Sequence, residues 1–180
     1  SGATQMFIGG SILAKRSNIT RIGNYAIGRA VETPYTQPAI TNMLVNRGAK
    51  LKMHGGNVYV LGNNSSLVNE ISGVTTVQAT CNLYVNGNIE NYNSATYMID
   101  GKVSFIKNWI NSAVATTSIV SAKSGIVEFV GTETQEVSGT TITQFEKLVV
   151  NNANNINLAQ SFKVDSLLTF TAGKIITNTD

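Results

Sequence analysis

Short apolar segments recur at nearly constant spacing, and this recurrence constrains the fold more than any other feature. Within residues 125–176 three of them read IVEFV from Ile126, LVV from Leu148 and LLTF from Leu167. Their starts lie about 20 residues apart, the period expected when a chain winds through stacked coils. Gly, Asn, Thr and Ser fill the intervals and favour turns. The pattern predicts short β-strands, one or more in each coil.

An internal echo extends this period toward the N-terminus. The heptapeptide NVYVLGN at Asn57 returns as NLYVNGN at Asn82, 25 residues later. Tyr59 and Tyr84 occupy the same place in the two copies. In stacked coils they would lie side by side in parallel strands, so we expect a tyrosine ladder. Such a ladder is mainly a packing device.

The sequence predicts an all-β protein, a parallel β-helix (solenoid) with a less regular N-terminal cap. Residues 1–50 form the expected cap and residues 51–180 the repeats. The alternative is an antiparallel β-sandwich, which would show turn signals about every 8–12 residues; the signals at Gly125, Gly131 and Gly139 are 6 and 8 residues apart. The corners of a coil have the same spacing, and the 25-residue echo favours the coil. We also expect turns at residues 54–56 and an irregular turn at residues 109–110.

Composition points to an uncharged polar surface. Apolar residues make up 42% of the 180 residues, enough for a sizeable core, whereas charged residues make up only 13%. A soluble domain usually has about 25% charged residues. Solubility must therefore come from Asn, Thr, Ser and Gly, as is common outside the cell. No apolar run approaches the ~20 residues that span a bilayer.

Charge is unevenly distributed along the chain. Up to His54 there are seven basic residues and one acidic residue, while the remainder has six basic and nine acidic residues. A basic end of this kind could meet an anionic partner. A solvated strand face explains it more simply, and we expect no nucleic-acid partner.

Residues that could carry catalysis are sparse. Hydrolysis of a glycosidic bond needs two placed carboxylates, and the densest acidic group is Glu128, Glu133, Glu136 and Glu146. These glutamates are expected to be ordinary surface charges, with Glu128 facing solvent. His54 is the single histidine, so a multi-histidine metal site is excluded. Cys81 has no second cysteine to pair with and is expected to be a buried, small apolar residue. We therefore assign no catalytic, cofactor-binding or metal-binding residues and expect no enzyme.

The last third of the chain resembles repeats of secreted and cell-surface proteins from Bacteroidetes. Those repeats combine F-x-G, T/S-x-Q-x-I/V-S-G, F-x-x-L-x-V-N-N and V-x-x-x-L-x-L-x-x-G. The matching positions here are Phe129, Gly131, Gln135, Val137, Ser138, Gly139, Phe145, Leu148, Val150, Asn151, Asn152, Val164, Leu168, Phe170 and Gly173. The middle of the chain is compatible with the repeats, whereas residues 1–50 match only as a mature N-terminus. The family has no shared catalytic residues, and its motif residues are structural.

The resemblance implies an adhesin-like protein exported by the type IX secretion system. We expect a secreted or cell-surface, non-enzymatic structural or adhesive module that continues in a longer parent protein. Its expected partners are the secretion machinery during export, and other surface proteins or further copies through the open ends of the β-helix. A carbohydrate-binding or carbohydrate-cleaving β-helix is the alternative, which would make polysaccharide a partner.

Overall fold

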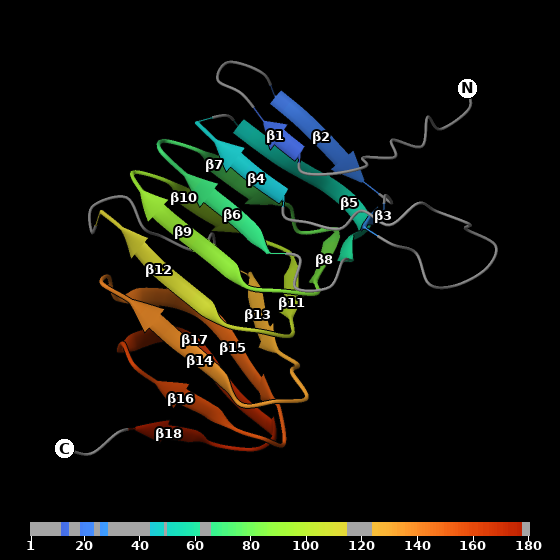
Figure 1. The fold of residues 1–180 in the computed structure, drawn as a ribbon. Helices are drawn as coiled ribbons and strands as arrows, with labels where there is room; N and C mark the ends of the chain where they lie inside the picture. Colours follow the sequence, from blue (N-terminus) through green and yellow to red (C-terminus); the bar gives the residue numbers. More distant parts are fainter. Residues whose placement is uncertain are drawn as a thin grey trace.

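The chain winds as a parallel β-solenoid, seen in a computed structural model that describes residues 12–14, 19–23, 26–28, 44–48, 50–61, 66–114 and 124–177. Every strand pairing among these residues is parallel. Figure 1 shows the coils following one another from the blue N-terminal end to the red C-terminal end. The predicted β-helix is confirmed, and the antiparallel sandwich is wrong. Within the described residues no helix is long and apolar enough to cross a membrane.

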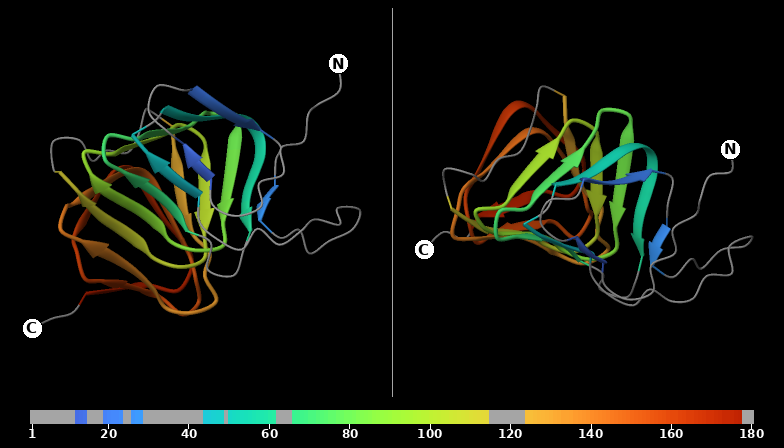
Figure 2. Two further views of the ribbon diagram at one scale, coloured as in Figure 1. Left: turned by 45° about the horizontal axis from the view of Figure 1, so that its top comes forward. Right: turned by 90° about the horizontal axis from the view of Figure 1, so that it is seen from above.

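Up to residue 105 the coils contribute strands to three faces, A, B and C, and the described strands beyond residue 105 lie on faces A and C. The two further views in Figure 2 show the stack from other sides. Face A is an eight-stranded sheet. In sheet order its strands are β1 (Ile12–Ala14), β4 (Leu44–Arg47), β6 (Leu67–Glu70), β9 (Ile89–Asn93), β12 (Trp109–Ala113), β14 (Gln135–Gly139), β16 (Ile156–Leu158) and β18 (Ile175–Thr177).

The other two faces share the long strand β5 (Lys50–Leu61). Its first half pairs on face B and its second half on face C. The remaining strands of face B are β2 (Ile19–Gly23), β7 (Val74–Val77) and β10 (Thr96–Ile99). The remaining strands of face C are β3 (Ala26–Gly28), β8 (Cys81–Val85), β11 (Lys102–Phe105), β13 (Ile126–Phe129), β15 (Thr143–Asn151) and β17 (Phe162–Ala172).

The tyrosine echo behaves as the period predicts. Tyr59 and Tyr84 are register partners in β5 and β8, and their rings stack with centroids 5.0 Å apart and planes 12° apart. The three apolar segments of the C-terminal third lie in β13, β15 and β17. These strands pair in the same parallel register as β5 and β8, so the same stacking of one coil on the next continues from β5 to β17.

The core is a set of apolar columns that run through the stack. One column on face C passes through Val60, Val85, Phe105, Phe129 and Val150, each at most 2% exposed. Strand residues alternate between inside and outside, so an unchanged register keeps each column on the inside. Cys81, 1% exposed, lies in the core as predicted.

Two local expectations were wrong. Residues 109–110 belong to strand β12 and not to an irregular turn. Trp109 is 1% exposed in the column of Leu67, Ile89 and Val137, because the coil register carries it inward. The turn expected at residues 54–56 is a bend inside β5, where Gly56 has φ 70° between the two halves of the strand.

The domain boundary at residue 50 stays a prediction. Of the four described strands before it, β1 to β3 pair in parallel with β4 and β5, and β4 pairs in parallel with β6. Residues 1–11, 15–18, 24–25, 29–43 and 49 lie outside the described residues.

We predict that Phe105→Ala lowers the free energy of unfolding by about 3–5 kcal/mol, because it leaves a cavity in a closed column. Denaturant titration measures this loss. Met98→Ala is the control, since Met98 is 43% exposed on β10 and its truncation should change stability by no more than about 0.5 kcal/mol. Equal losses from both variants would contradict the columnar core.

Candidate functional site

The outer side of face C carries the best-organised group of polar and aromatic side chains. Tyr59 and Tyr84 lie there because their neighbours Val58, Val60, Leu83 and Val85 point inward. Beside the tyrosines, the Asn82 side chain donates a hydrogen bond of 3.1 Å to Asn57 Oδ1. The row of Tyr59 and Tyr84 continues in register through Ser104 and Glu128. The echoed segments of β5 and β8 thus place like side chains side by side.

Glu128 is the centre of a polar cluster on this face. Its Oε2 lies 2.7 Å from Lys102 Nζ and accepts a 2.9 Å hydrogen bond from Ser104 Oγ. Asn151 Nδ2 donates a 3.3 Å bond to Oε1. The glutamate side chain is only 12% exposed, so it faces outward but is largely covered by these partners. The expectation that Glu128 faces solvent is therefore only partly met.

The charge state of Glu128 follows from these contacts. Burial raises its pKa, but the hydrogen bonds from Lys102 and Ser104, the charge of Lys102 and the bond from Asn151 together outweigh burial and lower it. The carboxylate is ionised and fully engaged. It is therefore suited to holding three neighbouring coils together, and not to donating a proton.

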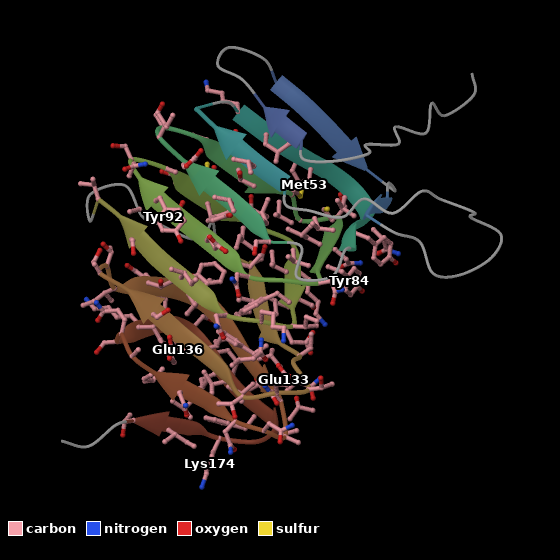
Figure 3. All side chains as sticks on the ribbon, in the orientation of Figure 1. Met53, Tyr84, Tyr92, Glu133, Glu136 and Lys174 are labelled. Carbon is pink, nitrogen blue, oxygen red and sulfur yellow. The ribbon has the colours of Figure 1, made fainter. Side chains whose placement is uncertain are left out.

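The four glutamates considered for catalysis lie on separate parts of the coil. Glu128 is on face C, and Glu136 lies on β14 of face A. Glu133 lies in the turn between those strands, where Lys107 Nζ is 2.7 Å away, and it lies apart from Glu136 in Figure 3. Glu146 lies at the register shift of β15. The structure does not bring them together as a pair flanking a substrate.

No metal site is evident among the residues that the structure describes, since they contain no group of three or more His, Cys, Asp or Glu side chains. The backbone of His54 lies in β5, and its side chain lies outside the described set.

A second outer cluster lies on face A around Tyr92, which Figure 3 places away from Tyr84. Tyr92 donates a 3.0 Å hydrogen bond to Glu90 Oε2, and Asn88 Nδ2 donates one of 3.0 Å to Oε1. Burial and the neighbouring Glu90 raise the pKa of Tyr92 to about 12. The phenol is therefore neutral at physiological pH and acts as a hydrogen-bond donor.

The most regular polar feature is internal. Asn46, Asn69, Asn91 and Asn111 occupy successive register positions of face A, and each is at most 4% exposed. Asn69 Nδ2 donates to Asn91 Oδ1 at 3.2 Å, and Asn91 Nδ2 to Asn111 Oδ1 at 3.5 Å. We call these four residues the asparagine ladder. It ties each coil to the next at the corner between faces A and B.

Two buried threonines form further hydrogen bonds with side chains of the asparagine ladder. Thr75 Oγ1 accepts from Asn46 at 2.9 Å and donates to Asn69 Oδ1 at 3.1 Å. Thr143 Oγ1 accepts from Asn111 at 3.1 Å and from Trp109 Nε1 at 2.9 Å. Buried polar groups cost free energy unless they are bonded, and here they bond one another.

Sequence reasoning missed the ladder, although a signal for it is present. Each asparagine stands two residues after an apolar residue that begins a strand of face A: Leu44, Leu67, Ile89 and Trp109. The apolar-x-Asn pattern recurs at intervals of 23, 22 and 20 residues. Val137-x-Gly139 ends it, because a Cβ at position 139 would lie 2.1 Å from Asn111 O.

The motif residues of the C-terminal third also have structural roles. Gln135 is 1% exposed and donates to Phe105 O at 3.1 Å, while its Oε1 accepts from Gly131 N at 2.8 Å. Asn152 Nδ2 donates to the same Oε1 at 3.0 Å. Gly173 has φ 77°, and a Cβ there would lie 1.9 Å from Asn152 O. These residues close the corner between faces C and A.

Comparison with known proteins adds no relative: no family model, curated protein or solved structure matches this chain. The functional argument therefore rests on the geometry and on the sequence features described above. The geometry is that of a stack in which many of the described polar side chains join one coil to another.

We predict that Asn91→Asp destabilises the fold most strongly near neutral pH. Asn91 Nδ2 faces two acceptors, Ala95 O at 3.1 Å and Asn111 Oδ1. A carboxylate there would be buried against oxygen atoms, which costs about 3 kcal/mol or more. Burial raises the folded-state pKa of such an acid. The loss of unfolding free energy should therefore shrink as pH falls toward the pKa of the acid in the unfolded state. Denaturant titrations of both proteins at each pH measure the difference. Asn57→Asp, at an exposed position, is the control, and a pH-independent difference for Asn91→Asp would refute this reasoning.

A second prediction concerns Glu128→Gln. The lowered pKa of Glu128 means that its stabilising contribution is complete above the unfolded-state pKa and is lost as pH falls through the folded-state pKa. At neutral pH the free energy of unfolding of the wild type should exceed that of the variant by up to about 1 kcal/mol. The two free energies should converge in acid. Unfolding titrations at several pH values, with Glu136→Gln for comparison, measure this convergence; a constant gap would contradict it.

Proposed function

We propose that this chain is a non-enzymatic structural or adhesive module of a secreted, cell-surface protein. The observation that carries the proposal is the continuous stack of coils, in which apolar columns, the asparagine ladder and the corner residues all serve coil-to-coil contact. A repeated coil makes an extended surface whose rows repeat from coil to coil. Such a scaffold acts through its shape and its repeated faces.

The extracellular location rests on composition and on the resemblance to Bacteroidetes repeats. With only 13% charged residues, the surface depends on uncharged polar side chains. Our proposal of export by the type IX secretion system is supported by this resemblance, which covers residues that build the coil, among them Phe129, Gln135 and Gly139. These residues support a structural role for the motif.

The test is the exposure of the full gene product on its native cells. An epitope-tagged product should be removed by protease added to intact cells, while a periplasmic marker protein stays protected. In a strain lacking type IX export the tagged product should remain inside and survive the protease. Protection from protease in the wild-type strain would overturn the proposal.

Polysaccharide binding is the second candidate function. It is favoured by the outward Tyr59–Tyr84 stack, flanked by the Asn57–Asn82 hydrogen bond and by Lys102 in the neighbouring row. Tyrosine rings present apolar area with a polar tip, which suits a sugar chain lying along the coils. Affinity electrophoresis of the wild type in gels containing host and plant polysaccharides should then show retardation that a Tyr59→Ala/Tyr84→Ala variant loses. Tyr92→Ala on face A is the matched control. Unretarded wild-type protein in every gel would remove this candidate.

A further inference from the structure

The stacked tyrosines on the outer side of face C keep part of their ring surface uncovered. The ring centroids of Tyr59 and Tyr84 are 5.0 Å apart, and the planes are 12° from parallel. Carbon atoms in contact lie only about 3.5–4.0 Å apart. Rings in contact at the larger centroid distance must therefore be offset, which is an arrangement that aromatic pairs prefer. The offset leaves part of each stacked ring face open, and both side chains are partly exposed.

The polar tips of these two rings are also unused by the protein. Within the described part of the chain, neither the Tyr59 nor the Tyr84 hydroxyl has a hydrogen-bond partner. The hydroxyls of Tyr92 and Tyr97, in contrast, both donate to oxygen atoms of the protein. A tyrosine with an open ring and an open hydroxyl suits a ligand that has both an apolar side and polar groups. A sugar ring, with its C–H faces and its hydroxyls, is such a ligand.

The charges beside the tyrosines cancel one another. In the row of Tyr84 the next residues are Ser104 and Glu128, and Lys102 lies in the neighbouring row as the partner of Asn82. Lys102 Nζ is 2.7 Å from Glu128 Oε2, so the two side chains add no net charge to this surface. The lysine side chain is 38% exposed and the glutamate side chain 12%. The ammonium can therefore still donate to a ligand, whereas the carboxylate is covered.

One further charge belongs to these two rows in the described part of the chain. Lys147 follows Lys102 and Ile126 in their row. It is three strand spacings from Tyr84, a distance of about 14 Å or more. At physiological ionic strength, salt screens exposed charges over about 8 Å. The surface around the tyrosines is therefore close to neutral as long as the Lys102–Glu128 pair is intact.

We propose that the outer side of face C around Tyr59 and Tyr84 binds an uncharged polysaccharide, and that Glu128 sets this preference by neutralising Lys102. The inference rests on the polysaccharide-binding candidate above and deepens it by naming the class of polymer. The ring faces take the apolar sides of the sugar units, while the phenol hydroxyls and Lys102 Nζ bond to sugar oxygens. An acidic polymer would bring carboxylates against the rings without an unpaired cation to receive them, which costs free energy.

Pairs of polymers with one backbone and different charge test this preference. Hydroxyethyl cellulose, dextran and galactomannan are each immobilised beside the carboxymethylated form of the same backbone. Biolayer interferometry measures binding of the chain at about 0.15 M salt, where the field of the basic residues before His54 is screened beyond about 8 Å. Binding that is lost in Tyr59→Ala/Tyr84→Ala is assigned to the tyrosine site. Circular dichroism of each variant establishes that it is folded.

The wild type should show tyrosine-dependent binding to at least one neutral polymer and weaker binding to its carboxymethylated form. Glu128→Gln leaves Lys102 without its counter-charge. This variant should raise the affinity for the carboxymethylated form relative to the neutral form by about two- to fivefold, the effect of one exposed ion pair. Glu128→Gln/Lys102→Gln is uncharged again and should restore the wild-type ratio. Glu136→Gln makes the same change on face A and should leave the ratio unaltered.

Three outcomes would overturn the role of Glu128 while polysaccharide binding still stands. They are equal tyrosine-dependent binding of the wild type to both forms of a polymer, a ratio that Glu128→Gln does not change, and a changed ratio that persists in the double variant. The last would show that a lost contact, and not an uncovered charge, alters the preference. Absence of tyrosine-dependent binding to every neutral polymer would overturn the inference together with the polysaccharide candidate. Surface exposure on cells is measured separately and does not depend on either result.

Discussion

The fold depends on parallel strand pairing that repeats from coil to coil without losing register. A strand inside the stack, such as β8 or β9, hydrogen-bonds to the strands one coil before and one coil after it, so its backbone donors and acceptors are satisfied between coils, not within them. Register then decides what lies inside. The column from Val60 to Val150 stays closed because each step aligns an apolar residue with the next. A slip of one residue would turn every column outward.

Corners are where this arrangement needs polar side chains. At the corner between faces A and B, the asparagine ladder satisfies its own amides and nearby backbone carbonyls, for example through Asn69 to Thr96 O at 2.8 Å and Asn91 to Ala95 O at 3.1 Å. At the corner between faces C and A, Gln135 and Asn152 do the same. A buried amide is tolerated because every coil supplies its neighbour's partner. The asparagine ladder and the Gln135–Asn152 pair thus join neighbouring coils at the two corners.

Side chains on the outside of the molecule also make contacts between neighbouring coils. The Tyr59–Tyr84 stack, the Lys102–Glu128 pair and the Lys107–Glu133 pair each join residues of different coils. A surface built from such contacts suits a scaffold.

Much of this was readable from the sequence, because a local repeat becomes a local contact in a solenoid. The spacing of apolar segments and the echo of NVYVLGN in NLYVNGN determined the coil, the parallel pairing and the tyrosine stack. The inward position of Trp109 and the bend within β5 were not readable, since the same letters suit a turn until the register of neighbouring coils is known. The covering of Glu128 by Lys102, Ser104 and Asn151 was hidden for a similar reason: its partners come from two other strands, β11 and β15, and lie 23 to 26 residues away in the sequence. The period of the sequence thus determined which residues stack on one another. Only the tertiary structure decided which side chains are covered, because covering depends on the side chains of the neighbouring coil.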